Sequence, residues 1–335
     1  MGLIGYTCSY TPAELLAATG FKPYRLLHGD VGLSAKGENS VRVDACSLVK
    51  LNIGYLIENQ EKFVAIVGST GCDMARRMFD VISELTDIPV YLFNNPRTDK
   101  PRIFYDEIDW LVGELENLSK EKFSPKVLET EIQRWEEARN RYRVYAQKRA
   151  QNPSLISTTN FQQVAVNYHK GDIELSEFPS CPFPTGGGGN RWVADKPRVY
   201  LLGSPFPYEA HQILELLELN LRIAGDFNCG ISRFLNINIK EKNLNGIKDA
   251  YYNQPPCIFK RPNKQFYEFV GTQIKQLECK GIIAWTLDYC DIYEFELKRI
   301  ERIFQLPVLR IRSNLSFQNL NQLKTRIGAF AEMLA

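Results

Sequence analysis

The sequence predicts an α/β protein built on parallel sheets, and three observations support that class. Apolar runs of strand length at 62–68, 198–203 and 281–285 are each followed by a turn and then a helical pattern. Another apolar run at 89–93 completes a strand–turn–helix–strand order, which is typical of a parallel sheet. A stretch rich in glycine and proline at 178–197 separates two such regions, so we expect two α/β halves.

The first half is predicted to contain helices and strands in alternation. Thr11 as N-cap, Pro12 at the first helical position and Gly20 at the end mark an opening short helix. The elements expected after it are a helix over 46–58, a strand over 62–68, a helix over 74–85 and a strand over 89–93. From 105 to 150 the pattern is long, charged and helical, and its mixed charges predict solvated surface helices.

The second half repeats this alternation. Strands are expected at 198–203, 221–224, 281–285 and 307–311. Helices are expected at 209–219 and 264–277, and two more follow, one that ends at 304 and one that begins at 320. We therefore place an N-terminal α/β domain at 1–180, with a helical segment at about 105–150, and a C-terminal α/β domain at 195–335. The glycines at 186–189 indicate a linker or surface loop, because no strand precedes them and no phosphate-loop spacing follows.

Composition excludes several classes of function. The chain has 335 residues, with 41 Lys and Arg against 39 Asp and Glu, a net charge of +2. A nucleic-acid-binding protein usually carries a clear excess of basic residues on one surface, and a net charge this close to zero does not indicate one. The most apolar windows are far shorter than the ~20 residues that span a bilayer, and the N-terminal residues do not form a secretory signal. We therefore expect a cytoplasmic protein that binds neither nucleic acid nor membrane.

Two of the eight cysteines occupy positions that suggest a site. Cys72 follows the strand 62–68 and Cys290 follows the strand 281–285, and each precedes an aspartate and a helix. Ligands of open parallel sheets bind beyond the carboxyl ends of the strands, so these thiols should face a cleft between the halves. A helix N-terminus is also expected to lower the pKa of a thiol and so favour the thiolate that binds metal. Cys46, at the start of a predicted helix, is the best third ligand.

The ordinary alternative is that these cysteines are buried core residues, because free cysteine is often buried. No CxxC or CxC pair is present, which argues against zinc fingers and ferredoxin-type clusters. Cys229 and Cys257 are weaker candidates that either line the cleft or substitute as ligands. Cys8, Cys181 and Cys279 are interpreted as structural.

Several blocks resemble one known family in sequence and in order. They are CSYTPAELLAATGFKPYRL, VDACSLVKLNIGYLIE, GSTGCDMARRMFDVI, YLFNNPR, LDYCDIYEFELKRI, LPVLRI and TRIGAFAEML. Together they resemble the 2-hydroxyacyl-CoA dehydratase and benzoyl-CoA reductase subunit family (the 2-hydroxyglutaryl-CoA dehydratase D-component type) over nearly the whole chain. The turn Cys72–Arg76 and the closing TRIGAFAEML are the most specific blocks.

The resemblance implies two Rossmann-like domains with a cluster site in the cleft between them. It implies a 4Fe-4S cluster held by Cys46, Cys72 and Cys290, and an oxygen-sensitive lyase that acts on an acyl-CoA thioester. In that family an ATP-dependent activase delivers one electron, and a ketyl radical of the substrate lets a β-hydroxyl leave. The resemblance also implies a dimer, either a homodimer or a heterodimer with a paralogous subunit.

Three alternatives stay open at this point. The first is a reductase of the same family, acting on an aromatic acyl-CoA or a small molecule, with a double-cubane iron–sulfur cluster on the same three cysteines. The second is a non-catalytic partner subunit. The third is an α/β protein without any cluster. Iron and sulfide counts after anaerobic purification would separate a single cube, a double cubane and a protein without a cluster. Purification with and without a paralogous subunit would identify a non-catalytic partner.

The remaining candidates are polar residues in predicted loops and turns. Arg76, Arg77 and Arg97 lie after strands, where they either contact CoA phosphates or are simply solvated. His28 is interpreted as a turn residue rather than an acid–base group. Asp30 and Glu38, in loops near it, are weaker candidates still. No residue is assigned as a catalytic acid or base.

Two geometric expectations follow. The sulfurs of Cys46, Cys72 and Cys290 should converge to roughly 6–7 Å from one another, as iron–thiolate bonds around a cube require. The site should lie in the cleft between the halves, with the 105–150 helices outside it.

Overall fold

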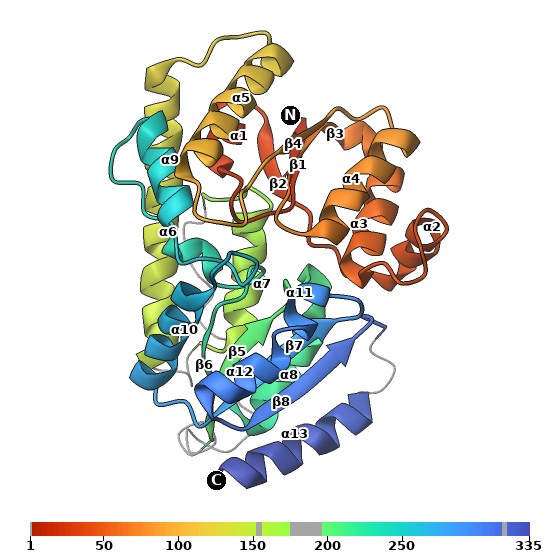
Figure 1. The fold of residues 1–335 in the computed structure, drawn as a ribbon, viewed down its shortest axis with the longest axis vertical. Helices are drawn as coiled ribbons and strands as arrows, with labels where there is room; N and C mark the ends of the chain where they lie inside the picture. The colour runs from red at the N-terminus through yellow and green to blue at the C-terminus, as the bar shows by residue number, and fades with distance from the viewer. Residues whose placement is uncertain (1, 152–155, 175–195, 317–319) are drawn as a thin grey trace.

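The fold consists of two parallel four-stranded sheets of the same strand order, as predicted for a protein of two Rossmann-like halves (Figure 1). A computed structural model describes residues 2–151, 156–174, 196–316 and 320–335. The strand orders are β2-β1-β3-β4 in one sheet and β6-β5-β7-β8 in the other, and every strand pair is parallel. In each half the first and third strands lie at the centre. Parallel strands covered on both faces need apolar side chains throughout, and β3 and β7 are buried along almost their whole length.

The N-terminal half follows the predicted alternation, with small shifts of the boundaries. Its elements are β1 (Leu3–Tyr6), α1 (Ala13–Ala18), β2 (Lys22–Arg25), α2 (Ser34–Glu38), α3 (Ser47–Glu58), β3 (Phe63–Ser69), α4 (Asp73–Leu85), β4 (Val90–Phe93), α5 (Pro101–Ser119), α6 (Pro125–Gln151) and α7 (Thr158–His169). One detail of the predicted first helix is wrong, because Pro12 is the N-cap in place of Thr11. The helix ends at Ala18 with Thr19 as its C-cap, and Gly20, with a φ of +81°, follows the cap and ends the helix as predicted.

The C-terminal half contains the predicted strands and helices and one helix, over Leu244–Asn253, that was not predicted. Its elements are β5 (Arg198–Gly203), α8 (His211–Asn220), β6 (Arg222–Asp226), α9 (Leu244–Asn253), α10 (Lys264–Gln276), β7 (Gly281–Leu287), α11 (Asp291–Glu294), α12 (Leu297–Phe304), β8 (Val308–Ser313) and α13 (Leu320–Leu334). The linker predicted at 178–197, with its glycine run and Cys181, lies almost wholly outside the described residues.

Loops that follow the strands of one sheet contact loops that follow the strands of the other. Hydrogen bonds join Arg25 Nη1 to the Cys229 carbonyl (2.6 Å), Tyr208 N–H to the Leu27 carbonyl (2.9 Å), Arg261 N–H to the Arg97 carbonyl (2.7 Å) and Ser47 N–H to the Asp288 carbonyl (3.3 Å). Because parallel strands all end at one edge of their sheet, these contacts bring the two carboxyl edges together. Any side chain that follows a strand in either half therefore approaches this junction.

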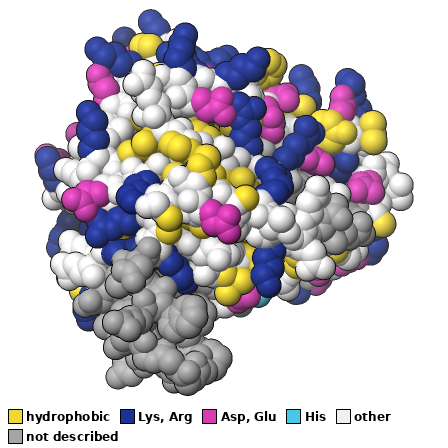
Figure 2. All heavy atoms as spheres, turned by 90° about the horizontal axis from the view of Figure 1, so that it is seen from below, with side chains coloured by type: hydrophobic (Ala, Val, Ile, Leu, Met, Phe, Trp, Pro, Cys, Tyr) yellow, Lys and Arg dark blue, Asp and Glu magenta, His cyan; other side chains and the backbone are white. Residues whose placement is uncertain are grey.

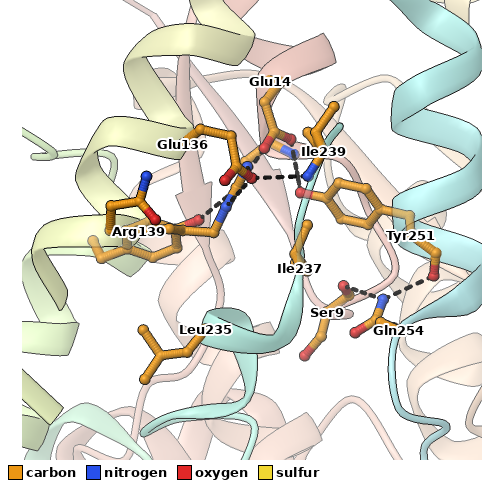
Figure 3. Close-up of polar contacts among 12 residues, drawn as sticks. Ser9, Glu14, Glu136, Arg139, Leu235, Ile237, Ile239, Tyr251 and Gln254 are labelled. Carbon is orange, nitrogen blue, oxygen red and sulfur yellow. Dashed lines mark hydrogen bonds and ion pairs between the residues drawn. The ribbon is translucent and has the colours of Figure 1, made fainter. Parts of the chain in front are cut away.

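The long helix α6 contacts both halves, and it is not the solvated surface helix that the charge pattern predicted. Figure 3 shows Arg139 of α6 pointing at Glu14 of α1 and at Glu136. Arg139 and Glu14 are fully buried and lie 2.5 Å apart (Nη1 to Oε1). Tyr251 of α9 donates a hydrogen bond to the other Glu14 oxygen at 2.7 Å. The charges that suggested a surface helix thus include a buried ion pair that joins α1, α6 and α9.

No helix of the described residues is long and apolar enough to cross a membrane. On the face seen from below, basic and acidic side chains are interspersed with apolar ones (Figure 2). That face carries no block of a single charge sign, in keeping with the net charge of +2.

We predict that Glu14→Gln lowers the free energy of unfolding by about 3–5 kcal/mol, because it leaves the buried Arg139 guanidinium short of a charged partner. Urea denaturation followed by circular dichroism measures the change. Glu131→Gln is the matched control, because Glu131 pairs with Arg134 at the surface and its loss should cost less than about 1 kcal/mol. Equal losses in the two variants would contradict the proposed role of the buried pair.

Candidate metal centre

Each of the three predicted cysteine ligands is the N-cap residue of a helix. Cys46 precedes α3, Cys72 precedes α4 and Cys290 precedes α11. Cys72 lies three residues after the end of β3, and Cys290 lies three residues after the end of β7. Because β3 and β7 hold the same place in sheets of the same order, these two cysteines occupy equivalent positions in the two halves.

The structure brings these three thiols into electrostatic contact. Thiolate charge on Cys72 or Cys290 raises the pKa of Cys46, and charge on Cys290 also raises the pKa of Cys72. Cys46 and Cys290 pack against the same hydrophobic core. The bond from Ser47 N–H to the Asp288 carbonyl joins the start of α3 to the loop that carries Cys290.

The expectation that a helix N-terminus gives these three thiols a low pKa is wrong for the metal-free protein. Burial raises the pKa of Cys46 far above its ordinary value and that of Cys72 to about 12, and it raises the pKa of Cys290 as well. Backbone N–H groups at the starts of α3 and α4 do lower the pKa of the first two, as the helix N-terminus argument requires. The loss of water around the buried thiolate raises the pKa by more than these backbone N–H groups lower it.

Ser204 supports Cys290 from the neighbouring strand. Its hydroxyl accepts a hydrogen bond from Leu287 N–H at 3.0 Å and also bonds to the Cys290 thiol. Gly203 makes this position possible, since its φ is +140° and a Cβ there would lie 1.7 Å from the Trp285 carbonyl oxygen. The predicted glycine turn after the strand 198–203 therefore places a hydroxyl beside a candidate ligand.

A polynuclear cluster and a single metal ion place different demands on the three thiols. Within the described ranges, no three His, Cys, Asp or Glu side chains are placed to hold one metal ion. In an iron–sulfur cube each thiolate binds a different iron, so the sulfurs lie further apart than the ligands of one ion. The charges of the three thiols act on one another's pKa, so the thiols lie near one another, and the expected spacing of their sulfurs around a cube stays a prediction.

A second group of cysteines, Cys8, Cys229 and Cys257, lies on loops near the first. Cys229 and Cys8 each raise the pKa of Cys257. Burial alone would raise the pKa of Cys229, but Arg233 and Arg25 outweigh it and lower that pKa. The interpretation of Cys8 as an isolated structural residue missed this grouping, because residues so far apart form no local motif. Cys279 is buried between α10 and β7.

The other sequence candidates lie outside the cysteine groups. His28 is buried and stacks on Tyr55 with ring centroids 3.5 Å apart, and its Nε2 bonds to the Tyr24 hydroxyl at 3.1 Å. It therefore has a structural role, as predicted. Asp30 accepts a bond from Gly32 N–H in a turn. The remaining candidates, Glu38, Arg76, Arg77 and Arg97, are exposed.

Two cavities differ in their relation to the cysteines. A cavity of about 630 Å³ lies beside the Cys257 loop and is lined by residues that include Tyr10, Arg97 and Lys260. No residue of α5 or α6 lines this cavity, but Cys46, Cys72 and Cys290 do not line it either, so the expectation that these helices lie outside the cysteine site stays a prediction. A cavity of about 780 Å³ lies at the α5–α6 turn, and no cysteine lines it.

Comparison with known proteins gives one full-length family match. The family model of the 2-hydroxyglutaryl-CoA dehydratase D-component matches residues 8–334. A putative dehydratase subunit, YjiM, of Escherichia coli strain K12 is 22% identical over 99% of this chain and 91% of its own length. The (R)-phenyllactyl-CoA dehydratase beta subunit of Clostridium sporogenes is 21% identical with the same coverage. A mutant laminin-binding adhesin (Lmb) of Streptococcus agalactiae aligns over the full length of both chains at 12% identity, but its TM-score of 0.23 supports no inference.

We predict that Cys229 of the metal-free protein is alkylated at lower pH than Cys72. The thiolate is the reactive form and exists above the pKa, which Arg233 and Arg25 lower for Cys229 and burial raises to about 12 for Cys72. Iodoacetamide labelling across pH 6–10, read by mass spectrometry of peptides, measures both profiles. Arg233→Met should move the Cys229 profile to higher pH and leave Cys72 unchanged. Coinciding profiles in the parent protein would contradict the assignment.

Proposed function

The chain belongs to the 2-hydroxyglutaryl-CoA dehydratase D-component family, and from that premise we propose that it is the iron–sulfur subunit of a 2-hydroxyacyl-CoA dehydratase. The observation that carries the proposal is the family match over residues 8–334. The substrate class follows from the (R)-phenyllactyl-CoA dehydratase subunit, which matches 99% of this chain. The proposed reaction removes water from a 2-hydroxyacyl-CoA thioester.

The proposed cofactor is a 4Fe-4S cluster bound by Cys46, Cys72 and Cys290. A bound cluster would supply one-electron chemistry and an open iron, because three cysteines leave one iron of the cube without a protein ligand. The chain's own part is to hold three thiolates on helix N-termini, where backbone N–H groups stabilise their charge. The Ser204 hydroxyl fixes the orientation of the Cys290 sulfur.

The cavity of about 630 Å³ is the proposed site for the CoA part of the substrate. Its lining includes four basic side chains, Arg97, Lys260, Arg261 and Lys264, against the single acidic residue Asp99. CoA carries several phosphate charges, which guanidinium and ammonium groups bind. Tyr252 and Phe269 also line the cavity and offer aromatic surface to the adenine.

The proposed partners are a paralogous or identical subunit and an ATP-dependent activase. The Clostridium sporogenes relative is a beta subunit by name, which implies another subunit in that enzyme. Val43 and Phe295 are 82% and 84% exposed, and they lie within five residues of Cys46 and Cys290 in sequence. Exposed apolar side chains beside a reactive site suit a surface that a partner covers.

We predict that Cys72→Ala lowers the iron content of the anaerobically purified protein by about four atoms per chain and abolishes dehydration. Iron and acid-labile sulfide assays measure the loss, and activity is tested with a 2-hydroxyacyl-CoA in the presence of the partner and activase. Cys279→Ala removes a buried cysteine outside both groups and should retain iron and activity. A Cys72→Ala protein with full iron content would refute the ligand assignment. Formation of a reduced acyl-CoA in place of an unsaturated one would favour the reductase alternative.

We predict that the double variant Arg97→Gln/Lys264→Gln raises KM for the CoA thioester roughly tenfold and leaves the iron content unchanged, because two phosphate contacts are lost. Both side chains are exposed at the cavity, so the fold should tolerate the change. Steady-state kinetics measure KM. Lys126→Gln is the matched control, because Lys126 lines the 780 Å³ cavity at the α5–α6 turn. An unchanged KM in the double variant would place CoA elsewhere.

A further inference from the structure

The segment between α9 and α10, residues 254–263, lies between the proposed CoA cavity and the turn that leads to Cys72. Lys260 and Arg261 of this segment line the cavity of about 630 Å³. Phe259, just before them, is buried, and its ring packs against Gly71 of the Cys72 turn, residues 69–72. A Cβ added to that glycine would lie 3.4 Å from two atoms of the ring. One short stretch of the second half therefore contacts both the cavity and the Cys72 turn of the first half.

The Lys260 ammonium group crosses the junction of the two halves. Its Nζ donates hydrogen bonds to the Asn95 side-chain oxygen (2.8 Å) and to the Pro96 carbonyl (2.7 Å), on the loop that follows β4. It also lies 4.9 Å from the centroid of the Tyr10 ring and 5.4 Å from that of Tyr252. These partners are uncharged, and burial lowers the pKa of Lys260 to about 8. An anionic ligand in the cavity would therefore stabilise the charged form of this side chain.

Asn95 extends this contact to the Cys72 turn. It is 2% exposed, and its backbone N–H donates a hydrogen bond to the Thr70 hydroxyl at 3.0 Å. Thr70 lies two residues before Cys72, and its own N–H donates to the Phe93 carbonyl at the end of β4 at 3.2 Å. A chain of hydrogen bonds thus runs from the Lys260 ammonium to the turn that carries a proposed metal ligand.

Arg261 anchors the same segment on its other side. Its backbone N–H donates a hydrogen bond to the Arg97 carbonyl of the first half at 2.7 Å, and its Nη2 donates to the Glu296 carboxylate at 2.8 Å. Glu296, between α11 and α12, is 5% exposed and also accepts a hydrogen bond from the Tyr267 hydroxyl at 2.5 Å. These contacts hold the backbone of the 254–263 segment in place, so Lys260 stands on a fixed support between the cavity and the loop after β4.

We propose that Lys260 is a positioning residue that couples the CoA cavity to the Cys72 turn. The inference rests on the proposed function, which supplies the CoA ligand and the metal at Cys72, and it adds a link between these two sites. A CoA phosphate in the cavity keeps the ammonium charged, and charge-assisted hydrogen bonds to Asn95 and Pro96 are stronger than neutral ones. The Cys72 turn is then held more firmly, and by linkage an ordered turn favours CoA in return.

A lysine with only a structural role would hold the two loops equally well whether the cavity is empty or filled. The proposed role requires that the Cys72 turn become more ordered when CoA binds. The order of that turn is measurable without any turnover, so the test does not depend on the activity of the enzyme.

Hydrogen–deuterium exchange of a peptide that covers residues 69–74 tests the proposal. The full-length chain is purified anaerobically and measured with and without saturating CoA, both after reconstitution with iron and sulfide and in the metal-free form. We expect CoA to slow the exchange of this peptide about fivefold or more in both forms. Lys260→Met keeps an apolar stem but removes the ammonium, and it should abolish this effect of CoA.

Two further variants separate coupling from binding. Lys264 lines the same cavity but pairs with Glu268 of its own helix, so Lys264→Gln should weaken CoA binding and keep the slowed exchange at saturation. Thr70→Val removes the hydroxyl that accepts from Asn95, so it should lose the slowed exchange although CoA still binds. Isothermal titration calorimetry measures binding. Circular dichroism identifies any variant that has lost its fold, and Thr70→Val then serves in place of Lys260→Met.

The outcomes separate this inference from the proposed function. CoA that binds and leaves the exchange of residues 69–74 unchanged would overturn the role of Lys260 and leave the CoA cavity intact. Slowed exchange that persists in Lys260→Met at saturating CoA would overturn it as well. A chain that binds no CoA would refute the proposed CoA cavity, and this inference with it. Loss of the slowing in Lys260→Met and Thr70→Val, but not in Lys264→Gln, would establish the coupling.

Discussion

The site depends on one constraint, which is that the carboxyl edges of two parallel sheets face each other. Parallel strands must all end at the same edge, so each half delivers every post-strand loop to one side. When two such halves meet at those edges, residues as distant as Cys72 and Cys290 become neighbours without any local motif. The pairing is reinforced by hydrogen bonds such as that from Arg25 Nη1 to the Cys229 carbonyl.

A rigid connection between the halves is needed for such a junction, and α6 supplies it. At the middle of α6, Arg139 pairs with Glu14 of the first half. Near the C-terminal end of α6, Arg149 pairs with Asp226 of the second half at 3.1 Å. Breaking a buried pair leaves an uncompensated charge, so a sliding or opening of α6 against either half carries a large free-energy cost. The helix therefore fixes the distance between the edges that hold the cysteines.

The sequence allowed most of the fold to be predicted, because apolar runs and breakers mark parallel strands directly. Strands β1 and β2 were missed: Gly2 and Gly5 interrupt the apolar pattern of the first, and Pro23 interrupts that of the second. The positions of Cys72 and Cys290 at strand ends were predictable for the same local reason. The grouping of Cys8, Cys229 and Cys257 was not, since it depends on how two halves dock. The buried face of α6 could not be predicted, because charged residues that form buried ion pairs look the same in sequence as charged residues on a solvated face.

The two cysteine groups solve the cost of burial in opposite ways. Burial raises the pKa of Cys46, Cys72 and Cys290, and no cation is among the groups of the described residues that shift these pKa values. That group is therefore neutral when empty, and metal binding must release its protons. Around Cys229 the buried cations Arg233 and Arg25 outweigh desolvation and lower the pKa of the thiol. The first group therefore favours protonated thiols, whereas the two guanidinium groups beside Cys229 favour its thiolate.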